Sequence, residues 1–119
     1  MKDLQKTCKL ALVQAAPIMF DKKACTQKAV QLIEECASNG AEFIVFPELF
    51  IPGYPYAMTF GFSVGRRKED GRKDWSQYYE NSILVPGEET ALLGEAARKA
   101  GAWVSIGISE RDPDRKSVV

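Results

Sequence analysis

A single carboxylate lies in an apolar stretch of the sequence, FPELFIPGYP, at residues 46–55. Glutamate is almost never fully buried unless another group pairs with it. Glu48 is therefore either a surface residue where the chain turns or a carboxylate with a chemical role. We expect the apolar residues 49–51 to surround it. Desolvation disfavours the ionised form of a carboxyl group, which suits a general base at neutral pH.

Other side chains that could do chemistry are few. The chain contains no histidine, which excludes from it Ser/His/Asp triads, Cys/His dyads and histidine-containing zinc sites. Its three cysteines are Cys8, Cys25 and Cys36. An odd number without an export signal does not predict a disulfide framework. No phosphate-binding glycine loop of either common type is present, and we predict no cofactor and no metal.

Length and charge limit the classes of partner. The 119 residues are a typical size for one domain, and 16 basic residues balance 16 acidic ones. This balance gives no electrostatic reason to expect a nucleic acid or an anionic membrane as partner. The charged start MKDLQKTCKL is unlike a secretory signal, and no apolar run approaches the roughly 20 residues of a membrane span. We therefore predict a cytoplasmic protein that binds a small molecule.

The elements that must position Glu48 alternate between strand and helix. Apolar runs predict strands at residues 9–17, 42–46 and 103–108, and a helix is predicted at residues 22–38 and another opening at Glu88. Asp21 is a good N-cap, while Gly40 and Gly101 are good stops. This order predicts an α/β fold with a parallel sheet, strands covered on both faces, and right-handed crossovers.

The predicted helix at residues 22–38 has one apolar face. Cys25, Ala29, Leu32 and Cys36 recur at steps of four, three and four, which places them together. The two cysteines of this face could be a metal or redox pair. Free cysteine usually behaves as a small buried hydrophobe, so we predict that both are inert core residues facing the sheet.

Glu48 follows the second predicted strand, at the edge of a parallel sheet where ligands usually bind. Pro47 restricts the chain just before it. We predict that the carboxylate points into a concavity lined by aromatic residues. Tyr54 is the second candidate residue, for substrate binding, because it offers a ring and a hydroxyl. A surface glutamate that caps a helix start is the alternative on spacing alone.

A long aromatic connection spans residues 54–87. Its charged block, RRKEDGRKD at residues 66–74, is predicted to be a solvated surface. Trp75, Tyr78 and Tyr79 have helical spacing, which predicts a helix that lays an aromatic stripe on the core, although the rings could also form the wall of a pocket.

The segment FIVFPELFIPGYP resembles the glutamate motif of the nitrilase (carbon–nitrogen hydrolase) superfamily. The order of KLALVQAAP, VPGEET and SIGISERD is similar to the opening half of that family, and the likeness covers about residues 9–112. FGFSVGRRKEDGRKDW and YYENSILVPG are most similar to true nitrilases and cyanide-processing relatives, rather than to amidases or carbamoylases.

The resemblance implies a four-layer αββα sandwich and a catalytic Glu, Lys and Cys. The cysteine attacks the nitrile carbon, the glutamate takes a proton, and the lysine stabilises developing charge. Glu48 matches the glutamate. The lysine and cysteine have no match, because Lys116 comes too early and all three cysteines precede Glu48.

We therefore expect residues 1–119 to be the N-terminal part of a carbon–nitrogen hydrolase domain. The leading hypothesis is hydrolysis of an organic nitrile, by a protein that forms a homo-oligomer at full length. One alternative is an amidase or carbamoylase activity. Others are a catalytically silent fragment that associates with other nitrilase chains, and a stand-alone binding module.

Overall fold

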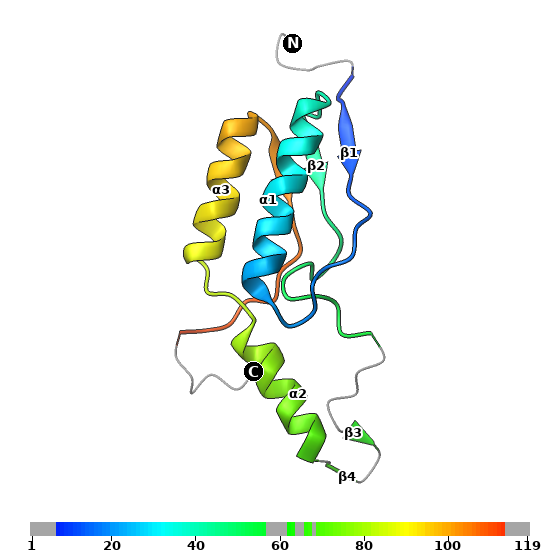
Figure 1. Ribbon diagram of the computed structural model, residues 1–119, viewed down its shortest axis with the longest axis vertical. Coiled ribbons are helices and arrows are strands. Elements are labelled where there is room, and N and C mark those ends of the chain that lie inside the picture. The colour runs from blue at the N-terminus through cyan, green and yellow to red at the C-terminus, as the bar shows by residue number, and fades with distance from the viewer. Residues whose placement is uncertain (1–6, 57–61, 64–65, 68, 114–119) are drawn as a thin grey trace.

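A computed structural model describes residues 7–56, 62–63, 66–67 and 69–113 (Figure 1). Lys116 lies outside this part. The elements in chain order are β1 (Leu10–Leu12), α1 (Lys22–Ser38), β2 (Phe43–Val45), β3 (Phe62–Ser63), β4 (Arg66–Arg67), α2 (Glu69–Glu80), α3 (Glu88–Ala100) and β5 (Trp103–Ser105). The structure thus confirms the predicted α/β class. None of the described helices has the length and apolar character that crossing a membrane requires.

Three parallel strands form the main sheet, in the order β1-β2-β5. The register pairs Ile44 of the central strand with Ala11 on one side and Val104 on the other. Each strand is shorter than predicted, at three residues. Pro47 contributes to this result, because it has no N–H with which to continue the ladder.

The helix boundaries follow the predicted caps. The Asp21 carboxylate accepts a hydrogen bond of 3.0 Å from the Ala24 N–H, which caps the start of α1. Gly40 follows α1 with φ +87°, and Gly101 ends α3 with φ +63°. Glycine adopts this left-handed conformation without steric cost, so both turns from helix to strand are encoded locally.

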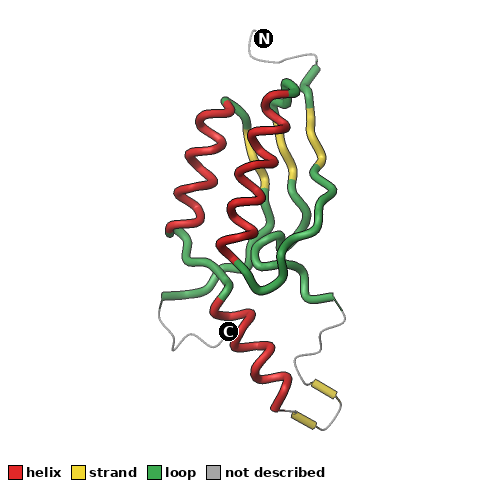
Figure 2. Tube along the Cα trace, in the orientation of Figure 1, coloured by secondary structure: helices red, strands yellow, loops and turns green. Residues whose placement is uncertain are grey.

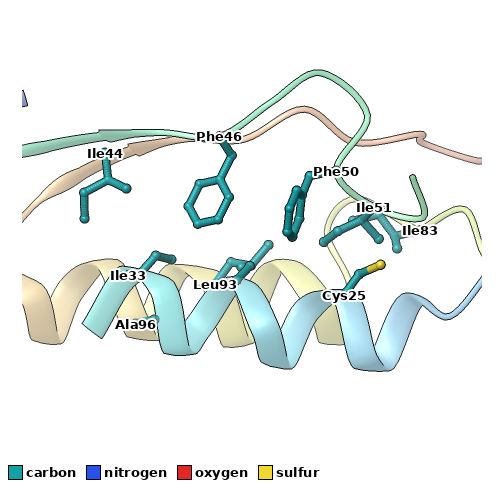
Figure 3. Close-up of a cluster of buried hydrophobic side chains, with 10 residues drawn as sticks. Cys25, Ile33, Ile44, Phe46, Phe50, Ile51, Ile83, Leu93 and Ala96 are labelled. Carbon is teal, nitrogen blue, oxygen red and sulfur yellow. The ribbon is translucent and has the colours of Figure 1, made fainter. Parts of the chain in front are cut away.

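Both long helices cover the same face of the sheet (Figures 1 and 2). The chain advances in one direction from β1 to β2 to β5, so crossovers of one hand place α1 and α3 on one side. Side chains from the sheet and its extensions meet the helices in the core (Figure 3). The buried apolar residues are Cys25, Ala29, Ile33, Ile44, Phe46, Phe50, Ile51, Ile83, Leu93 and Ala96.

The buried face of α1 differs slightly from the prediction. Cys25, Ala29 and Ile33 are fully buried, while Leu32 and Cys36 are partly buried at the edge of the core. Because α3 packs beside α1, the buried face of α1 turns toward both the sheet and α3. Leu32 and Cys36 therefore pack against the core from its edge, while Ile33, which the prediction did not include, is fully buried.

The opposite face of the sheet is uncovered by the described residues. Leu12 is 73% exposed and Trp103 is 76% exposed, and both alternate along their strands with residues that face the helices. The described residues thus cover one face of the strands, and the second cover that the four-layer prediction implies is not among them. The described residues therefore form one layer of helices packed on one sheet.

We predict that the isolated chain associates through this exposed face, because large contiguous apolar surfaces are unstable in water. Leu12→Ser should lower the associated fraction in sedimentation velocity. Leu92→Ser is the matched control, since Leu92 is 49% exposed on α3, away from that face. An equal effect of the two substitutions would contradict the prediction.

We further predict slow labelling of Cys25. Burial raises the pKa of its thiol, and the Sγ donates to the Ile18 carbonyl at 3.0 Å. Cys8 is exposed. If the Cys25 site opens at a cost of about 3 kcal/mol, its reaction with a thiol reagent is about a hundredfold slower than that of an open thiol. Cys8→Ser should remove a fast phase, and fast labelling that persists at Cys25 would refute its assignment to the core.

Candidate active site

Glu48 lies just beyond the carboxyl end of β2, the central strand of the sheet. This confirms the position predicted for it. Parallel strands end at the same edge of a sheet, so residues that follow β1 and β5 lie beside it. Its catalytic role stays a prediction.

A bulge carries Glu48 out of the strand ladder. The Phe46 N–H donates to the Ser105 carbonyl at 2.8 Å, and the Phe50 N–H donates to the Gly107 carbonyl at 2.8 Å. An advance of two residues, from Ser105 to Gly107, thus matches an advance of four, from Phe46 to Phe50, and residues 47–49 project from the sheet. We call them the Glu48 bulge. Bulges of this kind redirect a side chain and are common beside active sites.

The backbone conformation of the bulge directs the side chains of Glu48 and Leu49 to different sides. Leu49 has φ +49°, in the left-handed region that non-glycine residues seldom adopt. Glu48 and Leu49 consequently line different cavities. Strain at such a position costs on the order of 1–3 kcal/mol and is found most often at functional sites.

A cavity of about 710 Å³ lies against the bulge. Four aromatic rings contribute to its wall, so the predicted concavity is present. Apart from Glu48, the described lining residues carry no charge. The lining residues are Val13, Gln14, Ala15, Ala16, Pro17, Met19, Phe20, Pro47, Glu48, Phe50, Tyr54 and Tyr56. Such a cavity suits a small, largely apolar molecule held next to a carboxylate.

The surroundings of Glu48 differ from the sequence expectation. The side chain is exposed, and within the described residues it makes no hydrogen bond or ion pair. Of the three apolar residues after it, Phe50 lines the same cavity, Leu49 lines a separate one and Ile51 lies in the core. The expectation that all three surround the carboxylate was wrong, because the bulge turns them in different directions.

Tyr54 lines the same cavity as Glu48, and its ring centroid is 4.6 Å from that of Tyr56. Its role in substrate binding stays a prediction. The sequence interpretation missed Tyr56 and the contribution of the connection from β1 to α1, including Phe20. That connection also follows a parallel strand, so the rule that placed Glu48 at this edge could have identified it.

The loop after the bulge is fixed from both sides. The Gly53 N–H donates to the Leu49 carbonyl at 2.9 Å, and the Tyr78 hydroxyl donates to the Gly53 carbonyl at 2.9 Å. Gly53 has φ +114°, and a Cβ there would lie 2.2 Å from the Met19 Sδ. The positive φ of Gly53 therefore favours glycine at this turn, and a larger residue would also have to displace the Met19 side chain.

Helix α2 supplies the aromatic residues predicted for it. Trp75 and Tyr79 stack with centroids 5.3 Å apart, and Trp75 is 53% exposed. Tyr78 contacts the edge of Phe20 and holds the Gly53 turn. The stripe thus supports the loop and lines the separate cavity, rather than covering the sheet. In the charged block at residues 66–74, residues 72–73 are exposed as predicted and Asp74 is partly buried, while the side chains of residues 66–71 lie outside the described part.

The described residues hold no group of three or more His, Cys, Asp or Glu side chains that could bind a metal. Cys8 precedes the start of β1, whereas Glu48 follows the carboxyl end of the parallel strand β2, so the two lie at opposite ends of the sheet. Cys25 and Cys36 lie on α1, and burial raises the pKa of both thiols. The structure brings none of the three cysteines into the Glu48 cavity.

Comparison with known proteins places this geometry in context. Residues 9–118 match the family model of the carbon–nitrogen hydrolases. The aliphatic nitrilase of Sinorhizobium fredii (strain HH103) is 45% identical over 102 residues, which are 86% of this chain and 33% of that protein. The bifunctional nitrilase/nitrile hydratase NIT4B of Nicotiana tabacum is 42% identical over 106 residues, 89% of this chain and 30% of that protein. Nitrilase 1 of Arabidopsis thaliana is 40% identical over 106 residues, 89% of this chain and 31% of that protein.

The chain thus spans about a third of the length of these relatives, between 30% and 33%.

We predict that Tyr78→Phe destabilises the Gly53 turn by about 1 kcal/mol, the usual value of one hydrogen bond. Tyr79→Phe is the matched control on the same helix, because the ring contacts of Tyr79 survive the change. Urea unfolding followed by tryptophan fluorescence measures both. Equal stability of the two variants would contradict the role of the Tyr78 hydroxyl.

The same pair of variants has an expected pH dependence. Burial raises the pKa of the Tyr78 hydroxyl, against an opposing effect of its hydrogen bond with Ser109. The Tyr78 hydroxyl therefore stabilises the fold fully below its unfolded pKa of about 10. This stabilisation is lost as the pH rises through the higher pKa of the folded chain. The stability difference between the unsubstituted chain and Tyr78→Phe should shrink above about pH 10.

Proposed function

Because the chain belongs to the carbon–nitrogen hydrolase family, we propose that residues 1–119 are the part of a nitrilase domain that carries its general base, Glu48. The whole protein then converts an organic nitrile into a carboxylic acid and ammonia. The observation that carries the proposal is the exposed Glu48 carboxylate, presented by a bulge into a cavity whose other described lining residues are uncharged. The names of the relatives support nitriles over other substrates.

In the proposed reaction, Glu48 accepts the proton of a cysteine thiol while the sulfur attacks the nitrile carbon. The nitrile nitrogen gains a proton, which gives a thioimidate. One water adds and ammonia leaves, so that a thioester remains, and a second water releases the acid and restores the thiol. A lysine stabilises charge that develops on the substrate. The family resemblance places this cysteine and lysine outside residues 1–119.

We propose different roles for the residues that line the cavity. Its apolar wall fits the hydrocarbon part of a nitrile, and burial of that part contributes binding energy of about 25 cal/mol per Å². We propose that Tyr54 contacts the substrate with its ring or hydroxyl. Among the described lining residues Glu48 is the one charged group, so its carboxylate can receive a proton without an ion pair to any of them.

Two further expectations belong with this proposal. Association of the whole protein into a homo-oligomer stays a prediction, which sedimentation of the full-length protein would test. An amidase or carbamoylase activity is the alternative within the same family. Assays with the amide that corresponds to each nitrile would distinguish it.

The experiment is a graft in which this chain replaces the segment of the Sinorhizobium fredii aliphatic nitrilase that it matches. The grafted enzyme should release ammonia from aliphatic nitriles, and Glu48→Gln should lower kcat by about 10²- to 10⁴-fold, the usual contribution of a general base. Glu42→Gln is the matched control, because Glu42 is exposed at the other end of β2. It should leave kcat unchanged.

The isolated chain should release no ammonia, because a general base cannot replace the nucleophile. Turnover by the isolated chain that Glu48→Gln abolishes would show that its nucleophile lies within residues 1–119. A folded graft in which the Glu48→Gln and Glu42→Gln variants are equally active would refute the role of Glu48.

A further inference from the structure

We infer that Gly107 is a positioning residue that sets where the Glu48 carboxylate lies, an inference that rests on the proposed role of Glu48 as the general base. A Cβ atom built on Gly107 would lie 2.5 Å from the Leu49 nitrogen and 2.9 Å from the Glu48 Cα. Real Cβ atoms essentially never approach other atoms below 3.0 Å. The neighbours in question are backbone atoms, which cannot turn aside as a flexible side chain does.

The contact between Gly107 and the bulge is reinforced by hydrogen bonds. The Gly107 carbonyl accepts from the Phe50 N–H at 2.8 Å, directly after the bulge, and from the Ile51 N–H at 3.5 Å. Before the bulge, the Phe46 N–H is bonded to the Ser105 carbonyl at 2.8 Å. Gly107 therefore lies under the projecting residues and also closes their far end.

Hydrogen bonds on both sides limit how far the backbone of Gly107 can move. The Ser109 N–H donates to the Ile51 carbonyl at 2.8 Å, and the Ser109 carbonyl accepts from the Ile83 N–H at 2.8 Å. The Ser109 hydroxyl is also 2.8 Å from that of Ser82. Because the β5 extension is held on both sides, an added methyl group at residue 107 must move the bulge.

A movement of the bulge changes the position of the Glu48 carboxylate. Glu48 and Leu49 are successive residues that line two different cavities, and the left-handed φ of Leu49 separates them. A shift of the bulge backbone therefore changes the direction of the Glu48 side chain. Misplacing a catalytic group by about 1 Å can cost about a hundredfold in rate.

The test uses the grafted enzyme and compares Gly107→Ala with Gly94→Ala. Gly94 is an exposed glycine on α3, and a Cβ there meets no atom within 4 Å. Gly107→Ala should lower kcat per folded enzyme by about ten- to a hundredfold with little change in KM, because the apolar wall of the cavity is intact. It should also shift the acidic side of the pH–rate profile. Gly94→Ala should change neither.

Hydrogen exchange gives a readout that does not depend on activity. In Gly107→Ala the Phe50 amide should exchange faster, while the Phe46 amide, bonded to Ser105, keeps its protection. This pattern together with the loss of kcat supports the inference. A Gly107→Ala enzyme with the kcat and pH profile of Gly94→Ala overturns it.

If Gly107→Ala alone does not fold, the double variant Leu49→Gly/Gly107→Ala gives the bulge a residue with wider conformational freedom. A folded double variant with a lower kcat than Leu49→Gly supports positioning, and an equal kcat overturns it. Failure of both variants to fold, while Gly94→Ala folds, assigns Gly107 to folding and also overturns the inference. Failure of the proposed function is a different result, in which Glu48→Gln itself retains activity.

Discussion

Parallel pairing on both sides of β2 is the constraint on which the rest of the structure depends. A parallel neighbour cannot be reached by a tight turn, so each pairing requires a crossover, and α1 and α3 occupy these crossovers. The helices then bury Ile33, Ile44 and Ile51 completely between themselves and the sheet. Each such side chain contributes about 1.5–3 kcal/mol. The same pairing aligns the carboxyl ends of three strands at one edge.

The candidate site is a local departure from that pairing. After the ladder between β2 and β5, hydrogen bonds between the two segments continue at Phe46, omit residues 47–49 and resume at Phe50, just before the Ile51–Ile108 bridge. Because hydrogen bonds close the bulge at both ends, the carboxylate projects from a short segment of defined backbone rather than from a long loop. Glycines at 53 and 107 permit the close approaches that this arrangement needs. Precise placement of one side chain therefore depends on backbone contacts made by residues with no side chain.

The distribution of exposed apolar residues has a related origin. Crossovers of the same hand cover one face of the sheet and leave Leu12 and Trp103 exposed on the other. The described residues thus form two layers of the nitrilase-type αββα architecture, in a chain that matches about a third of its relatives' length, at 30% to 33%. A four-layer sandwich buries both faces of each sheet, which is a physical reason for strands that are apolar on both faces. Helix α2 lies outside this layering and supports the loop that follows the bulge.

The sequence by itself determined the features that depend on near neighbours along the chain. Asp21, Gly40 and Gly101 cap or end their helices through contacts within a few residues, so the boundaries of α1 and the end of α3 were predictable. The sequence also predicted the position of Glu48 at the carboxyl ends of the strands and contained the family motif around it. Tertiary structure decided what depends on partners distant in the sequence. Packing of α3 beside α1 made Ile33 rather than Leu32 a centre of the core, and pairing with Ser105 and Gly107 created the bulge. No periodicity in residues 46–51 encodes that bulge, because its geometry is set by hydrogen bonds to a strand about sixty residues away, at Ser105 and Gly107.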